Sequence, residues 1–127
     1  MSAETNQKYA ELASDERITK TAAALKENNL NVTIVETAAE AKVKALELLP
    51  EGSEVFTLQS DTLHKLGLME AIDDSGKYKS IRSQLNKLDR AKDADEMRKL
   101  GSAPDYAIGS VHAITEDGHA FIGSFSG

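Results

Sequence analysis

The chain of 127 residues contains no cysteine. This absence excludes disulfide bonds, thiolate chemistry, and any iron-sulfur cluster or cysteine-type zinc site built from this chain alone. Redox chemistry would therefore need a partner chain, and we expect no cofactor in this one. Aromatic residues make up only 5% of the sequence and tryptophan is missing, so the hydrophobic core has to be aliphatic.

The sequence also has no long apolar run and no excess of positive charge. No segment approaches the roughly 18 apolar residues of a transmembrane helix, and the N-terminus has no signal-like apolar stretch; the expected location is therefore the cytoplasm. The formal net charge of -6 and the pI near 5.0 argue against nucleic-acid binding, because no basic stripe is available to neutralise phosphates. The length fits one domain.

Apolar residues recur at helical and strand spacings in alternation. The expected helices and strands of the first half follow one another at residues 17–27, 32–35, 37–49, 55–58 and 62–72. Thr37 and Glu40 have the spacing of a capping box, which begins the second of these helices. Alternation with helix-length crossovers indicates parallel strands in an α/β layer architecture.

The second half changes from helix to strand. A helical stripe covers residues 81–100 with an interruption near Lys92, and Gly101 is expected to end it. Strands are expected at 106–108, 111–114 and 120–122. Asp117 and Gly118 form the dipeptide that a two-residue hairpin turn favours, so we expect the chain to end in a β-hairpin.

Hydroxyl side chains lie where the strand at 55–58 gives way to a helix. Open α/β sheets bind ligands at this position, and the hydroxyls of Ser60 and Thr62, with free backbone N–H groups, can hold a phosphate or carboxylate. The alternative is that one of them only caps the helix, and Asp61 would repel an anion.

Three histidines are present, and His64 is expected on the surface. His112 interrupts an apolar strand and needs a hydrogen-bond partner or a ligand. A buried, hydrogen-bonded imidazole is the alternative to a role in acid/base catalysis. A two-residue turn places His112 and His119 on the same side of the hairpin but too far apart to share a metal ion, and without a cysteine or a His-x-x-x-His pair no metal site is expected.

Several blocks of sequence together resemble the LUD-domain family of lactate utilization proteins. They are Glu16-Arg-Ile18 with Thr21-Ala-Ala, Val55-Phe-Thr57-Leu-Gln-Ser60-Asp-Thr62-Leu, Ser83-Gln-Leu85-Asn-Lys-Leu88-Asp89-Arg90, and Pro104-Asp105-Tyr-Ala-Ile-Gly109-Ser110-Val-His112-Ala-Ile-Thr115-Glu-Asp-Gly118. The resemblance implies an N-terminal helical or flexible segment at 1–13 and a single LUD domain at 14–127. It further implies a Rossmann-like, mostly parallel sheet with flanking helices, of the kind found in sugar-phosphate isomerases and CoA transferases.

The same resemblance implies a cytoplasmic component of a bacterial system that oxidises L-lactate beside iron-sulfur subunits. Family members normally continue past the final Ser-Gly, so the chain is expected to be truncated and its sheet incomplete. An unpaired strand at its end would favour pairing with another chain, which predicts a homodimer formed through that edge.

The resemblance and the expected sheet point to one set of ligand-binding residues at the carboxyl ends of the strands. They are Ser60, Thr62, Ser110, His112, Thr115 and Ser124. Three functions fit: a non-redox module that binds a small organic anion in lactate or organic-acid utilization, an isomerase- or transferase-like enzyme acting on a phosphate or CoA substrate, and a protein-interaction domain without a small-molecule site. For the enzyme, His112 is the best catalytic candidate.

Overall fold

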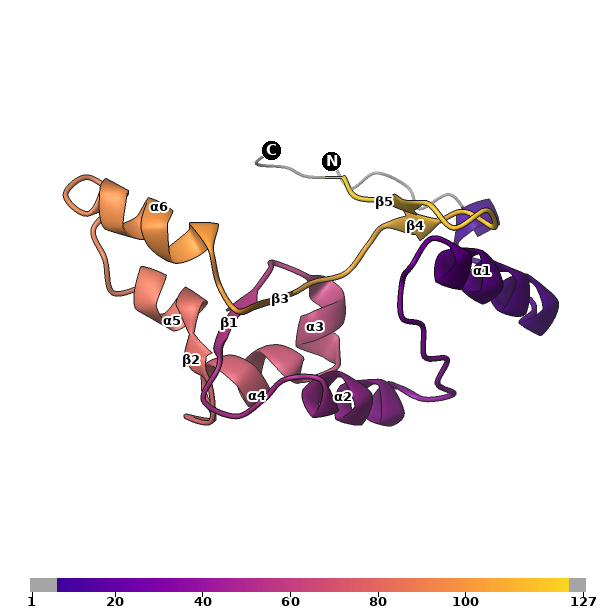
Figure 1. Cartoon of the computed structure of the whole chain (residues 1–127), viewed down its shortest axis with the longest axis horizontal. Coiled ribbons are helices and arrows are strands. Elements are labelled where there is room, and N and C mark those ends of the chain that lie inside the picture. Colours follow the sequence, from indigo (N-terminus) through magenta and orange to yellow (C-terminus); the bar gives the residue numbers. More distant parts are fainter. Residues whose placement is uncertain (1–6, 124–127) are drawn as a thin grey trace. The chain divides into compact units, whose positions relative to one another are not determined.

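A computed structural model describes residues 7–123 (Figure 1). One compact unit runs without interruption from Val35 to Ser110, and the other combines the residues before Val35 with those after Ser110. The single domain at 14–127 stays a prediction. Within residues 7–123, no helix combines the length and the hydropathy that crossing a membrane requires.

The unit that contains both ends of the chain is built from helices and a hairpin. It comprises the 3-10 helix η1 (Gln7–Tyr9), the helix α1 (Asp15–Glu27) and the strands β4 (Ala113–Ile114) and β5 (Ala120–Phe121). The expected first helix is thus confirmed. It begins at Ser14, whose hydroxyl accepts a hydrogen bond from the backbone of Arg17. It ends at Asn28 and Asn29, and Asn29 takes a positive φ of 63°, the left-handed conformation that stops many helices.

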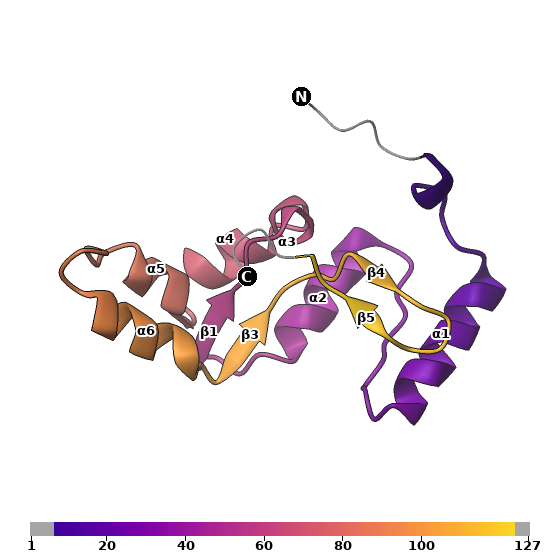
Figure 2. The same cartoon turned by 90° about the horizontal axis from the view of Figure 1, so that it is seen from above.

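The C-terminal hairpin is confirmed, but its turn differs from the predicted one. Thr115 and His119 bond to each other across the turn, so the loop has three residues instead of two. Gly118 takes a φ of 85°, as expected for a type I turn followed by a left-handed residue. Asp117 has no positive φ, because a three-residue loop needs only one such position. Figure 2 shows this turn beside α1, and a Cβ on Gly118 would lie 2.8 Å from the carbonyl carbon of Ala24.

The strand predicted at 32–35 is wrong. In the described part of the chain these residues form no strand, and no backbone hydrogen bond joins them to another segment. Ile34 is 53% exposed, so the β-branched run does not enter a core either. A β-branched sequence favours extended backbone, but a strand also needs a neighbour to pair with.

The unit from Val35 to Ser110 contains a three-stranded parallel sheet. Its strands are β1 (Glu54–Thr57), β2 (Lys79–Ser80) and β3 (Tyr106–Ile108), in the order β2-β1-β3. Both views show β1 and β3 side by side (Figures 1 and 2). The α/β class with a mostly parallel, unclosed sheet is therefore confirmed. The two-residue strand β2 was not predicted, because it lies between an expected loop and an expected helix.

Five helices connect and flank these strands. They are α2 (Ala38–Glu47), α3 (Asp61–Lys65), α4 (Leu68–Asp73), α5 (Ile81–Leu85) and α6 (Ala94–Ser102). The predicted cap holds at the start of α2, where Thr37 accepts from the backbone of Glu40, but the Glu40 carboxylate accepts from the backbone of Glu36 instead of Thr37. The helix predicted at 62–72 is two short helices, because Gly67 takes a left-handed φ of 68° between them. Gly101, expected to end α6, lies inside it.

The core lies against one face of β1. Val55 and Ile72 are fully buried and pack with Leu49, and partly buried apolar residues surround them. The other face of β1 carries Phe56, which lies toward Gly101 of α6. β1 is thus covered on both faces and paired on both sides, which fixes the position of its end.

Candidate functional site

The two serines predicted at the strand ends touch each other. Ser60 follows β1 and Ser110 follows β3, and their Oγ atoms are 2.7 Å apart. Parallel strands end at the same edge of a sheet, and because Thr57 pairs with Ile108, the residues that follow β1 and β3 begin at the same level of this edge. We call this edge the carboxyl-end border; it comprises Thr57, Ser60, Ser80, Arg82 and Ser110.

Ser60 has a second role, as the N-cap of α3. Its Oγ accepts a hydrogen bond from the backbone N–H of Leu63 at 3.2 Å. The capping alternative is therefore correct for Ser60, but it uses only an acceptor lone pair. Two serine hydroxyls carry two hydrogens, and one of them makes the bond between Ser60 and Ser110. The other hydrogen has no partner among the described residues, so the pair keeps one donor for a ligand.

Thr62 does not join this pair. It lies exposed in the first turn of α3, and no hydrogen bond of its hydroxyl to another described residue is found. A role in binding a ligand stays a prediction for Thr62.

A close approach of backbone to side chain keeps the ends of β1 and β3 together. The N–H of Leu58 donates to the carbonyl oxygen of Ile108 at 2.8 Å. A Cβ on Gly109 would lie 2.8 Å from Cδ1 and 3.2 Å from Cβ of Leu58, closer than carbon atoms pack. A glycine at 109 therefore lets Leu58 lie directly beside the chain that leads to Ser110.

A polar network that the sequence did not reveal lies beside the serines. The carboxylate of Asp73, at the end of α4, accepts a hydrogen bond from Thr57 Oγ1 at 2.8 Å and one from Ser80 Oγ at 2.6 Å. Thr57 is fully buried and Ser80 nearly so. Buried hydroxyls need partners, and the carboxylate satisfies both while it ties α4 to the ends of β1 and β2.

Arg82 completes this network by replacing a missing part of the sheet. Its Nε donates to the carbonyl oxygen and to Oγ1 of Thr57, each at 3.0 Å, and its Nη2 donates to the same carbonyl oxygen. The register pairs Val55 with Ser80, so a longer β2 would place residue 82 beside residue 57. The chain instead enters α5 at Ile81, and the guanidinium bonds to the carbonyl that the sheet leaves open. No sequence motif marks Arg82, because this role depends on β2.

His112 lies in the other unit and is exposed, so the buried imidazole weighed from the sequence is wrong. Its Nδ1 accepts a hydrogen bond from the backbone N–H of Gly123 at 3.0 Å. An accepting Nδ1 carries no proton, so the neutral ring has its proton on Nε2. In this arrangement His112 can donate from Nε2 but cannot accept a proton there, which limits its use as a general base.

Thr115 and its neighbours are occupied by the hairpin turn. The hydroxyl of Thr115 donates to the Asp117 carboxylate and accepts from the backbone of His119 at 3.1 Å. The hydrogen bond from Thr115, followed by that from His119, lowers the pKa of Asp117. Thr115 therefore serves the turn, and its expected ligand-binding role stays a prediction. Ser124, the last predicted residue, lies outside the described residues.

Glu116, beside Asp117 at the hairpin tip, faces cations from α1. Glu116 accepts from Arg17 Nε at 3.1 Å and lies 3.6 Å from Lys20 Nζ. The hydrogen bond from Arg17, with the charge of Lys20, lowers the pKa of Glu116. Both groups of the tip are thus held ionised, whereas acid/base catalysis needs two groups whose pKa values differ.

The histidines do not converge on a metal position. In the observed register His112 lies opposite Ile122 and His119 lies opposite Thr115. Because side chains alternate along a strand, the two imidazoles lie on opposite faces of the hairpin. The prediction that they lie on the same side is therefore wrong. His64 is exposed as expected, 3.1 Å from Glu70. Within residues 7–123 no three His, Asp or Glu side chains gather as metal ligands would.

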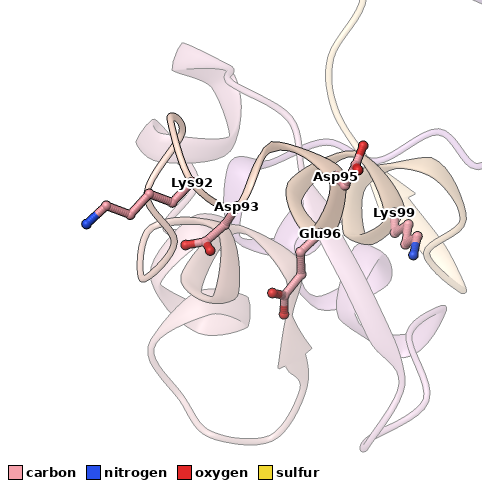
Figure 3. A pocket seen from close by; sticks show the side chains of 5 residues that line it. All are labelled: Lys92, Asp93, Asp95, Glu96 and Lys99. Atoms are coloured by element: carbon pink, nitrogen blue, oxygen red, sulfur yellow. The ribbon is translucent and has the colours of Figure 1, made fainter.

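A hollow of about 400 Å³ lies at the start of α6 (Figure 3). Its lining is entirely charged, from Lys92, Asp93, Asp95, Glu96 and Lys99. None of the predicted site residues lines it. Mixed charges on an exposed helix are typical of a solvated surface, so the hollow does not alter the choice of the carboxyl-end border as candidate site.

The model of the LUD domain matches residues 18–127. The chain belongs to the LUD domain family. No curated protein and no solved structure matches it. The LUD domain is associated with lactate utilization proteins.

Proposed function

We propose that this LUD-domain chain binds a small organic anion, as a non-redox component of lactate or other organic-acid utilization. The observation that carries the proposal is the contact between Ser60 and Ser110 at the joined ends of β1 and β3. Ligands of open α/β sheets bind at this edge. The serine pair can donate its remaining hydrogen to a carboxylate or a hydroxyl, and its lone pairs can accept from a hydroxyl.

The chemistry of the chain supports a binding module rather than an oxidase. Without a cysteine it cannot hold an iron-sulfur cluster by itself. We therefore propose that iron-sulfur subunits in the cytoplasm supply the electron transfer, while this chain presents the organic acid. Copurification of the untagged cysteine-rich subunits with the tagged chain supports this part, and their absence from the purified material argues against it.

Binding of L-lactate tests the proposal directly. A ligand present at one hundred times its Kd stabilises a protein by about 2.7 kcal/mol, which thermal unfolding resolves. We expect Ser110→Ala to weaken binding of L-lactate, because the variant removes one member of the pair without removing the cap of α3. Ser102→Ala is the matched control, since that hydroxyl bonds only to the backbone of Lys99 on α6. If L-lactate and other small organic acids leave the melting temperature unchanged at millimolar concentration, the proposal is wrong.

We also propose that two copies of the chain pair through an open sheet edge. Among the described residues, β2 and β3 are the outer strands of the parallel sheet, and unpaired edges invite another strand. Light scattering at high micromolar concentration measures the mass in solution. A strictly monomeric species rejects the pairing.

A further inference from the structure

Arg82 is held in a fixed position at the carboxyl-end border. Three donor contacts to Thr57 fix one side of its guanidinium, and its Cζ lies 5.9 Å from the centre of the Phe56 ring. Thr57 itself is fully buried. An arginine held in this way has already lost the side-chain freedom that an anion would otherwise have to restrict.

The bonds to Thr57 leave the end of the guanidinium available. A guanidinium has five N–H donors, and the contacts to Thr57 use those of Nε and one of Nη2. The two donors of Nη1 and the second donor of Nη2 have no partner among residues 7–123. One donor of Nη1 and the second donor of Nη2 form the end-on pair that binds a carboxylate through two parallel hydrogen bonds.

Arg82 also keeps its positive charge without a direct counterion. It takes part in none of the salt bridges of the described residues. The nearest acid in its network, Asp73, is separated from it by the hydroxyl of Thr57, which accepts from Arg82 and donates to Asp73. A partly buried cation in contact only with neutral groups attracts an anion.

We propose that Arg82 binds the carboxylate of the small organic anion, and that the ligand class is therefore a carboxylic acid. This inference rests on the proposed function. Arg82 lies on the β2 side of β1, and the pair Ser60 and Ser110 lies on the β3 side. Both groups belong to the carboxyl-end border, and in the proposed complex the carboxylate of a hydroxy acid bonds to Arg82 while its hydroxyl bonds to the serine pair.

The test compares a charged and a neutral ligand of the same shape on several variants. We expect the protein to bind L-lactate but to bind lactamide, its uncharged amide, roughly tenfold more weakly or worse. Arg82→Gln should remove this preference, and Arg82→Lys should restore part of it, because lysine keeps the charge without the two-pronged geometry. Arg90→Gln is the matched control, since Arg90 is an exposed arginine of the same unit. Calorimetric titration measures each Kd, and thermal unfolding without ligand shows that each variant is folded.

The outcomes separate this inference from the proposed function. If Arg82→Gln folds and binds L-lactate as tightly as the original protein, Arg82 is not the anion-binding group, whereas loss of binding in Ser110→Ala would still support the site. If Arg82→Gln does not fold, the two Kd values of the original protein provide the test, and equal affinity for L-lactate and lactamide overturns the inference. If the original protein binds no small acid at all, the proposed function itself is rejected.

Discussion

Replacing Thr57 by valine should measure how much the buried network stabilises the unit from Val35 to Ser110. Thr57 is fully buried at the end of β1. Its hydroxyl donates to Asp73 at 2.8 Å and accepts from Arg82 Nε at 3.0 Å. Valine has nearly the same shape, so the change removes both hydrogen bonds while the side chain still fills the space.

The expected loss follows from the charge of the two partners. A hydrogen bond to a charged group contributes about 1.5–3 kcal/mol to stability. Arg82 still bonds to the carbonyl oxygen of Thr57, so the main loss falls on Asp73, whose Oδ2 has no other donor among the described side chains. Burial of the additional methyl group returns about 0.8 kcal/mol. We expect a net loss of about 1–2 kcal/mol in the free energy of unfolding.

Urea denaturation and thermal unfolding of Thr57→Val and Thr57→Ser provide the assay. A loss of that size lowers the melting temperature by roughly 4–10 °C in a protein of this length. Serine keeps the hydroxyl and loses only a methyl group, which costs about 1 kcal/mol in a core. A double variant with Asp73→Ala should show that the two changes are not additive, because they remove the same bond. If valine is as stable as threonine while serine is not, the methyl group and not the network stabilises the strand end.

The remaining predictions concern the hairpin turn. Gly118→Ala should lower the free energy of unfolding by roughly 2–4 kcal/mol, because a positive φ costs about 1–2 kcal/mol in alanine and the new Cβ would meet the backbone of Ala24 at 2.8 Å. Gly52→Ala is the control, since Gly52 has nearly the same φ but no atom near the position of a Cβ. If denaturation shows an equal loss for both variants, the contact with Ala24 is unimportant. Glu116 has a lowered pKa in the folded chain, because of Arg17 first and then Lys20. Its stabilising contribution is therefore present above the ordinary pKa of a glutamate and is lost as the pH falls through the folded value. Melting temperatures of Glu116→Gln and the original protein should differ at pH 7 and converge as the pH falls below the folded pKa of Glu116, and a constant difference would contradict this explanation.

Local signals in the sequence predicted the start of α2 and the class of fold correctly. The hydroxyl of Thr37 accepts from the backbone only three residues away, so its effect does not depend on the rest of the chain. Alternation of apolar helices and strands was enough to predict a parallel sheet. The positions of Ser60 and Ser110, each just after a strand, were enough to place both at one edge.

Several departures from prediction depend on pairing between distant segments. The run 32–35 has the residues of a strand but no neighbour, and β2 has only two residues and becomes a strand because it lies beside β1. The length of the hairpin loop was set by cross-strand bonds, which moved His112 and His119 to opposite faces. Arg82 shows the same dependence most clearly, since it bonds to Thr57 where β2 stops.

The amino-acid sequence alone therefore determined the absence of thiol chemistry, the N-cap at Thr37, the parallel α/β class and the serines at the strand ends. These properties rest on composition or on contacts between residues close in the chain. Only the tertiary structure decided which extended segments become strands, how the hairpin is aligned, and that Arg82 and Asp73 meet at Thr57. Hydrogen bonds between segments far apart in the chain form only where folding brings their partners together, and no local pattern contains that information.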